Sequence, residues 1–186
     1  FPYTTLFRSA TLTGALEAGL LPLRTTHNDT KINNVRFDCQ TGRAAAVIDL
    51  DTVMPGLVHY DFGDMVRTCC FEGGEDETDL SAVHFRPEIL TALLQGYLDG
   101  AEQFITRRER EYLPVAGPLI CLEIGIRFLT DYLCGDVYFK KHRPRHNLDR
   151  ARVQFRRVAL LEEASAQIEA IFSRTRAGIS TAKRPA

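Results

Sequence analysis

His27-Asn28-Asp29-Thr30-Lys31-Ile32-Asn33-Asn34 is the stretch that decides the fold of this chain, together with Val47-Ile48-Asp49-Leu50-Asp51 further along. In the first stretch a lysine and an asparagine follow the aspartate by two and five positions. In the second, an aspartate ends a short apolar run. The two motifs stand in a fixed order and spacing, so together they are a more specific signal than either one alone.

A β-hairpin is predicted between the two motifs. Residues 35–37 and 44–48 have the character of two short strands, and they flank Asp38-Cys39-Gln40-Thr41-Gly42-Arg43, which supplies a glycine for the turn. The hairpin would carry Asn34 at its entry and Asp49 at its exit. Because the two strands of a hairpin are antiparallel, both residues would lie at the same end of it.

These residue types suit the transfer of a phosphoryl group from ATP. Mg²⁺ prefers oxygen ligands and is held by one or two carboxylates together with substrate phosphates, so Asn34 and Asp49 are the predicted metal ligands. Asp29 is the predicted catalytic base, placed to orient an acceptor hydroxyl and take its proton. The order is that of the protein-kinase motifs, in which an Asp contacts the substrate hydroxyl while an Asn and a second Asp hold the metal.

Three further segments extend the pattern: Tyr60-Asp61-Phe62-Gly63-Asp64, residues 125–133 and residues 135–140. With them, the chain resembles the aminoglycoside phosphotransferase and choline kinase superfamily, which has the protein-kinase fold. It is most similar to the N-acetylhexosamine 1-kinase branch, over roughly residues 20–165. The resemblance implies ATP and Mg²⁺, with the anomeric hydroxyl of an N-acetylhexosamine as acceptor. An aminoglycoside, choline or homoserine stays open as the acceptor, and the acidic residues in 72–79 would favour a cationic one.

The resemblance also implies which residues support the catalytic loop. Asp61 matches a buried aspartate that braces this loop through backbone contacts, and a buried carboxylate needs such partners to offset its desolvation. Asp61-Phe62-Gly63 spells the protein-kinase metal motif, but no strand is expected before it, so Asp49 stays the predicted metal ligand. His27 is expected to order the loop by hydrogen bonding. Lys31 would either neutralise the migrating phosphoryl group or lie in solvent.

The acceptor contacts are predicted on a later helix and on the segment that follows it. Arg127 and, more weakly, Tyr138 resemble acceptor contacts of the sugar-kinase branch. A guanidinium is a rigid fork of donors that suits sugar hydroxyls or an acetamido carbonyl. The alternative for Arg127 is a ladder of ion pairs with Glu123 and Asp131, four residues away on either side. Asp51 also has two possible roles, as a second metal contact or as the cap of a turn.

Two other classes of function account for part of the sequence. Asp49-Leu50-Asp51-Thr52, after an apolar strand, resembles the nucleophile motif of haloacid-dehalogenase-type phosphohydrolases. That fold requires further parallel strands alternating with helices, whereas the chain after residue 80 reads as almost wholly helical. The other alternative is a kinase-like binding domain without activity. It predicts the loss of at least one of Asp29, Asn34 and Asp49, all of which are present.

The expected fold is α+β and mostly helical: the C-terminal lobe of a protein-kinase-like fold, with a small β-hairpin at the catalytic loop and no N-terminal lobe. Residues 1–9 read as the translation of a sequencing-library adapter, 10–176 as the phosphotransferase lobe and 177–186 as a disordered tail. Because the catalytic motif begins at His27, no room is left before it for the lobe that binds most of the nucleotide. The chain alone is therefore predicted to be inactive, although its parent is expected to be an enzyme.

Caps and prolines predict the helix boundaries in the second half. Thr106-Arg107-Arg108-Glu109 is a capping-box pattern for a helix. Pro114 and Pro118 are expected to split this region before an apolar helix over 119–133. Asn147 is expected to cap a last long helix.

The composition agrees with a folded intracellular domain. A hydrophobic share of 45% argues against disorder, and a net charge of −1 gives no bulk attraction to nucleic acid or to a membrane surface. Glu123, Arg127 and Asp131 interrupt the apolar runs before they reach the ~20 residues of a membrane span. The five cysteines have no C-x-x-C spacing and read as reduced thiols. The expected partners are ATP and a small acceptor, and the expected location is the cytoplasm.

Overall fold

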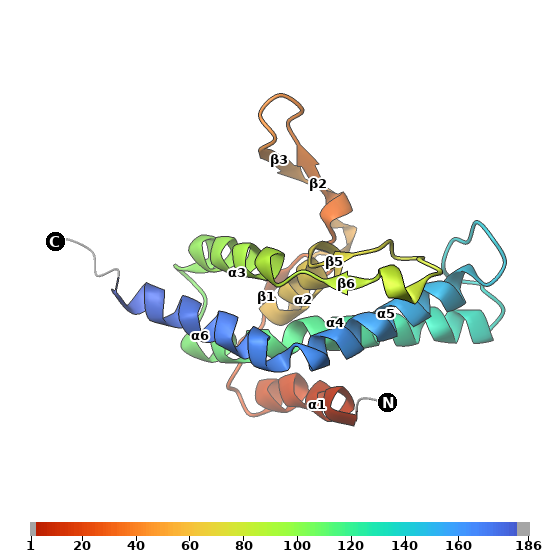
Figure 1. Cartoon of the computed structure of the whole chain (residues 1–186). Helices are drawn as coiled ribbons and strands as arrows, with labels where there is room; N and C mark the ends of the chain where they lie inside the picture. The colour runs from red at the N-terminus through yellow and green to blue at the C-terminus, as the bar shows by residue number, and fades with distance from the viewer. Residues whose placement is uncertain (1–2, 182–186) are drawn as a thin grey trace.

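The computed structural model describes residues 3–181, with side chains from residue 10 to residue 175. Helices make up most of this part of the chain, so the mostly helical fold is confirmed (Figure 1). The α-helices are α1 (Tyr3–Glu17), α2 (Val58–Cys69), α3 (Pro87–Ala101), α4 (Arg107–Leu133), α5 (His146–Glu163) and α6 (Ser165–Thr181). The strands are β1 (Arg24–Thr26), β2 (Val35–Phe37), β3 (Ala44–Val47), β4 (Met54–Gly56), β5 (Phe71–Glu72) and β6 (His84–Phe85). Three short 3-10 helices are η1 (Ile32–Asn34), η2 (Leu50–Thr52) and η3 (Leu80–Ala82).

Every sheet in residues 3–181 is a two-stranded antiparallel pair: β1 with β4, β2 with β3, and β5 with β6. The predicted hairpin is confirmed, since Val35 pairs with Val47. Gly42 has a φ of +67°, a conformation that glycine adopts without steric cost in such a turn. The phosphohydrolase alternative needs a parallel α/β sheet, and the described residues contain no parallel pair, so that alternative is wrong.

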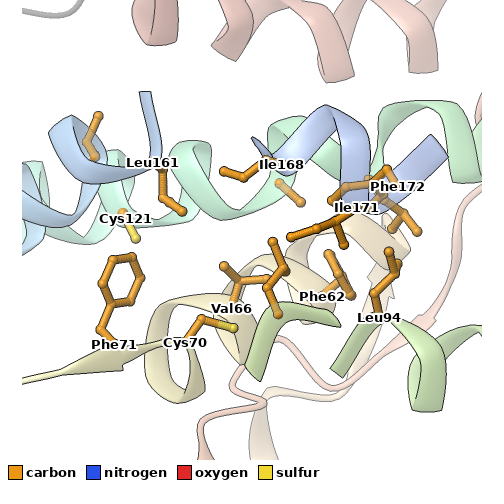
Figure 2. Close-up of a cluster of buried hydrophobic side chains, with 14 of the residues drawn as sticks. Phe62, Val66, Cys70, Phe71, Leu94, Cys121, Leu161, Ile168, Ile171 and Phe172 are labelled. Atoms are coloured by element: carbon orange, nitrogen blue, oxygen red, sulfur yellow. The ribbon is translucent and has the colours of Figure 1, made fainter. Parts of the chain in front are cut away.

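The main hydrophobic core lies between α2 and the helices that follow it. Figure 2 shows Phe62 and Val66 of α2 directed toward Leu94 of α3, Leu161 of α5 and Phe172 of α6. Full burial of such a side chain stabilises the fold by about 1.5–3 kcal/mol. A second, smaller cluster holds α1 and the start of α2 together; its buried members are Leu12, Ala15, Leu21 and Leu57.

Two glycines allow α4 to approach its neighbours closely. A Cβ at Gly63 of α2 would lie 2.5 Å from the carbonyl oxygen of Ala116 in α4. A Cβ at Gly125 of α4 would lie 2.7 Å from the ring of Phe155 in α5. Both distances are far inside normal van der Waals contact, so glycine at these positions sets the spacing of α2, α4 and α5.

Pro114 and Pro118 do not split the helix, so that prediction is wrong: α4 runs unbroken from Arg107 to Leu133. A proline inside a helix costs about 3 kcal/mol, because it removes one hydrogen bond and crowds the preceding turn. Tertiary packing offsets this cost, since Leu113 and Cys121 on either side of the prolines are fully buried. The predicted capping box is confirmed at the start of the helix, where the Thr106 hydroxyl accepts from the Glu109 backbone.

α4 is also long and apolar enough to cross a membrane by length and composition alone, with a mean hydropathy of 1.5 in its most apolar window. The charged residues Glu123, Arg127 and Asp131 had led to the opposite expectation. Half of that window is buried inside the structure, as in a core helix. The packing of α4 against α2 and α5 accounts for its apolar character.

The last helical region differs from the prediction. Asn147 is the second residue of α5 instead of its cap, and its fully buried side chain donates to Asp131 at 2.9 Å. The helix is interrupted at Ala164, so that α6 is a separate element. The disordered tail predicted over 177–186 overlaps the end of α6, which runs to Thr181, and residues 182–186 lie outside the described part of the chain.

Candidate active site

The catalytic-loop motif lies between β1 and η1, and Asp61 holds its backbone. The Asp61 carboxylate, in the first turn of α2, accepts the backbone N–H of His27 at 2.9 Å and that of Asn28 at 2.7 Å. Thr30 donates its hydroxyl to the Asp61 carbonyl oxygen at 2.6 Å. Hydrogen bonds to a carboxylate are charge-assisted and strong. These are the backbone contacts that the resemblance implies, although Asp61 is half-buried and not buried.

His27 and Thr52 tie the loop to the base of the hairpin. Nε2 of His27 lies 3.0 Å from the carbonyl oxygen of Ile48. The Thr52 hydroxyl donates to the carbonyl oxygen of His27 at 2.6 Å. Asn28 has a left-handed backbone, with φ +62°, and its side chain donates to the Thr52 carbonyl at 3.1 Å. His27 therefore makes the ordering hydrogen bonds expected of it.

Asp29, Lys31 and Asn34 meet in one cluster. Lys31 Nζ donates to Asp29 Oδ2 at 2.6 Å, so Lys31 is an ion-pair partner of Asp29 in the structure. The Asn34 amide donates to the same oxygen and to the Asp29 carbonyl, both at 2.8 Å. Asn34 is only 4% exposed, and packing therefore fixes its orientation. Two donors converge on Oδ2 of Asp29, while Oδ1 accepts no hydrogen bond from residues 10–175.

Asn34 and Asp49 lie at the base of the hairpin. The Ile48 N–H donates to the Asn34 carbonyl at 2.9 Å, and Asp49 follows directly. Asp49 is exposed and has a φ of +66°, a left-handed conformation that is uncommon outside glycine and recurs at functional sites. In the described residues no three His, Cys, Asp or Glu side chains form a metal-binding group. The amide oxygen of Asn34 and the carboxylate of Asp49 nevertheless fit Mg²⁺, which takes most of its other ligands from phosphates and water. Asp51 lies exposed in η2, whose N-cap position is occupied by Asp49.

A cleft of about 1100 Å³ brings the two predicted halves of the site together. Asp29 and Lys31 line it, and so do Arg127 and Tyr138 from the end of α4 and the segment after it. Its volume is slightly above the usual range for small-molecule sites, about 300–1000 Å³. The predicted base and the predicted acceptor contacts therefore face one cavity.

Arg127 does not belong to an ion-pair ladder, and that alternative is wrong. Within residues 10–175 no ion pair joins it to Glu123 or Asp131. Its guanidinium instead stands over the rings of Tyr138 and Phe139, 5.9 and 5.5 Å from their centroids. These distances are within the range of cation–π attraction. Arg127 and the two rings therefore form one wall of the cleft, which we call the Arg127–Phe139 wall.

Two charge clusters were not predicted from the sequence, and the first of them, Asp64 with Arg67 and Glu75, lines the cleft itself. Arg67 donates to the Asp64 carboxylate at 2.8 Å and to Glu75 at 2.7 Å. Burial raises the pKa of the Asp64 carboxyl above its ordinary value in spite of the Arg67 guanidinium. Arg24 binds Glu109 at 2.7 and 2.9 Å. The three-residue spacing of Asp64 and Arg67 on one helix could have predicted their ion pair. Glu109 was recognised only as part of the capping box, so its ion pair with Arg24 was not predicted.

Lys31 and Asn34 hold the Asp29 carboxylate, and Asp29 and Lys31 line the cleft, whereas Asn34 and Asp49 lie at the hairpin base and are not among its lining residues. A model of the phosphotransferase enzyme family (APH) matches residues 5–112. The chain belongs to this family, whose members are phosphotransferase enzymes. The match contains the catalytic loop, the hairpin and α2, and it ends before Arg127 and Tyr138. Family membership therefore supports the interpretation of the loop and the hairpin, and says nothing of Arg127 and Tyr138. The adapter origin of residues 1–9 stays a prediction.

Proposed function

We propose that this protein is a cytoplasmic, ATP- and Mg²⁺-dependent small-molecule kinase whose acceptor is the anomeric hydroxyl of an N-acetylhexosamine. The observation that carries the proposal is the cleft, because Asp29 and Lys31 line it together with Arg127 and Tyr138. Membership of the phosphotransferase family supports the chemistry. The resemblance of residues 125–140 to the sugar-kinase branch supports the acceptor.

On this proposal each of these residues has a role in the transfer. Asp29 orients the acceptor hydroxyl and takes its proton, while Lys31 and Asn34 fix the Asp29 carboxylate through Oδ2. Asn34 and Asp49 would hold Mg²⁺, which neutralises the charge of the phosphates when it is bound. Lys31 adds a positive charge beside the base. Arg127 donates to sugar hydroxyls with a guanidinium already fixed against aromatic rings.

The acidic residues in 72–79 give no argument for a cationic acceptor over a neutral one. The acidic residues in 72–79 would favour choline or an aminoglycoside if their carboxylates were available. Glu75, however, forms an ion pair with Arg67 at 2.7 Å, and Asp76 is hydrogen-bonded to His146 at 2.9 Å. Neighbouring side chains therefore already bind the two carboxylates that lie nearest the middle of this loop.

We also propose that residues 10–176 are the C-terminal lobe of a kinase-like fold. Large apolar side chains are exposed on and beside the hairpin, from 40% at Ile32 through 49% at Phe37 and 55% at Val47 to 60% at Leu50. Exposed apolar groups gathered in one region mark an interaction surface. The hairpin also projects away from the helices (Figure 1), where a second lobe would cover it. On this proposal the 186-residue chain alone binds the acceptor but does not turn it over.

The test measures ADP release with Mg-ATP from the longest product of the gene. The acceptor panel holds N-acetylglucosamine, N-acetylgalactosamine, choline, homoserine and an aminoglycoside. Asp29→Asn should lower kcat by about 10²-fold or more. Asp99→Asn is the matched control, because Asp99 is exposed on α3 and bonds only locally, to Gln95 at 2.8 Å.

The outcomes separate the competing functions. Turnover of N-acetylhexosamines that is lost in Asp29→Asn supports both the acceptor and the base. Turnover of another acceptor alone would support the proposed kinase activity and refute N-acetylhexosamine as the acceptor. No ADP from any acceptor would refute the kinase proposal in favour of a kinase-like binding domain without activity.

A further inference from the structure

The carboxylate of Asp131, in the last turn of α4, collects four hydrogen bonds although the residue is only 5% exposed. Its Oδ1 accepts the backbone N–H of Val137 at 2.9 Å and of Tyr138 at 2.8 Å. Its Oδ2 accepts the backbone N–H of Phe139 and the side-chain amide of Asn147, both at 2.9 Å. Three consecutive backbone groups therefore point at one carboxylate.

Asp131 and Asn147 also hold the turn that precedes these residues. Gly135 and Asp136 both have left-handed backbones, with φ of +93° and +60°. The Asp136 N–H donates to the Asp131 carbonyl at 2.7 Å, and the Asn147 amide reaches the Asp136 carboxylate at 3.0 Å. Arg150 closes the far end by donating to the Lys140 carbonyl at 3.0 Å. The segment from residue 135 to residue 140 is thus bound to α4 and α5 by polar contacts along its length.

Packing alone would not hold this segment. Val137 is 81% exposed and Tyr138 is 72% exposed, so they bury little apolar surface. Phe139 is the apolar anchor, with its ring centroid 4.6 Å from that of Phe128. The position of Tyr138 therefore depends on the Asp131 carboxylate.

The segment contributes Tyr138 and Phe139 to the Arg127–Phe139 wall, and α4 contributes Arg127. Arg127 precedes Asp131 by one helical turn, and its guanidinium lies over the two rings that the segment presents. We propose that Asp131 is a positioning residue for the acceptor: it fixes Tyr138 and Phe139 against Arg127, so that the wall is assembled before the acceptor binds. This inference rests on the proposed function, because it takes the wall as the acceptor contact.

Asp131→Asn tests the role with little change in size. An amide keeps one acceptor oxygen and presents an NH₂ group to the N–H of Phe139 or to the amide of Asn147, so donors face donors. Hydrogen exchange at the amides of residues 137–139 should accelerate by about tenfold or more. The Kd of the 186-residue chain for N-acetylglucosamine, measured by calorimetry, should rise by about tenfold. In the longest gene product, the acceptor KM should rise while kcat and the KM for ATP change by less than about twofold.

A second variant disturbs the turn without touching the carboxylate. Gly135→Ala places a Cβ in open space, so its effect comes only from the strained positive φ. Gly100→Ala is its control, because that glycine also has open space around it and lies inside α3. Asp99→Asn is again the control for Asp131→Asn. If circular dichroism shows that Asp131→Asn is unfolded, Gly135→Ala decides the question by the same readouts.

The results distinguish this inference from the proposed function. Binding by the wild type that weakens in the variants, with faster exchange at residues 137–139, supports the positioning role. Equal Kd values for wild type and Asp131→Asn would overturn it and leave the proposed function standing. Absence of N-acetylhexosamine binding by the wild-type chain would overturn the proposed acceptor, and the positioning role with it.

Discussion

Replacing Glu109 with glutamine tests how the strand before the catalytic loop is held against α4. The Glu109 carboxylate is 1% exposed and accepts Arg24 Nε at 2.7 Å, Arg24 Nη2 at 2.9 Å and the Thr106 N–H at 2.7 Å. Arg24 also donates to the Phe104 carbonyl at 2.6 Å. Glutamine has nearly the same shape but only one acceptor oxygen. Its NH₂ group would face one of these donors, and Arg24 would lose its counter-charge.

The magnitude follows from how much of the pair is buried. Removing one partner of a buried ion pair costs about 3–5 kcal/mol, because the other charge is left without compensation. The Arg24 side chain is 26% exposed, so water can solvate the guanidinium in part. The expected loss is therefore lower, about 2–3 kcal/mol of unfolding free energy. At about 2–4 °C per kcal/mol for a domain of this size, Tm should fall by about 4–12 °C.

Urea unfolding at pH 7, followed by circular dichroism, measures this loss as a lower midpoint with an unchanged m-value. Arg24→Gln and the double variant complete a double-mutant cycle, whose coupling energy should reach about 1 kcal/mol or more. A loss below about 0.5 kcal/mol for Glu109→Gln would refute the reasoning, because surface substitutions alone have effects of that size.

The same variant predicts a pH dependence. Burial by itself would raise the pKa of Glu109, but the bonds from Arg24 and Thr106 outweigh it and hold this pKa below its ordinary value. A carboxyl whose pKa is lowered on folding contributes its stability above its unfolded pKa and loses it as the pH falls through its folded pKa. The difference between wild type and Glu109→Gln should thus be complete at pH 7 and shrink below about pH 4.3. A difference that stays constant down to about pH 3 would contradict the predicted pKa shift.

Three further predictions concern helix packing, the catalytic loop and a buried histidine. Gly63→Ala brings a methyl group within 2.5 Å of the α4 backbone and should lower the free energy of unfolding by about 1–3 kcal/mol, measured in urea. Gly100→Ala, its control, should not lower it. Equal urea midpoints for the two variants would contradict the close contact. Asp61→Asn weakens the acceptor for the Asn28 N–H, so exchange of this amide should accelerate by about tenfold or more, and unchanged exchange would exclude the brace. Burial lowers the pKa of His59, so the unfolded chain binds more protons below about pH 6.5 and stability should fall from pH 7 toward pH 5.5. His59→Gln should flatten that slope, and an identical slope in the variant would assign it to other groups.

The clustering of Asp29, Lys31 and Asn34 was predictable because it depends on local geometry. Asp29, Lys31 and Asn34 are close enough in sequence for one loop to bring them together, and the loop does so. The hairpin then returns the chain to Asp49 by antiparallel pairing, which a strand–turn–strand pattern reveals without any tertiary information.

The backbone contacts of Asp131 were not predicted, because the sequence spacing offered only an ion pair with Arg127 as the alternative to an acceptor contact. Asp131 stands one turn from Arg127, which suggested an ion pair, but a carboxylate in the last turn of a helix can also bind the chain that folds back after it. The partners of Glu109 depend on a residue 85 positions away. The prolines of α4 were misjudged for a related reason, because their local cost was visible in the sequence and the compensating burial was not.

The two halves of the site are joined by the contact between α2 and α4. The first turn of α2 holds the catalytic loop through Asp61, and the last turn of α4 holds the Arg127–Phe139 wall through Asp131. Gly63 allows the two helices to approach closely, since a Cβ at this position would lie 2.5 Å from the Ala116 carbonyl oxygen. A helix is stiff over these lengths, so the distance between the proposed base and the proposed acceptor wall depends on how α2 packs against α4. A misplacement of about 1 Å can cost 10²-fold in rate, and Gly63→Ala should therefore reduce kcat more than its effect on stability alone would suggest.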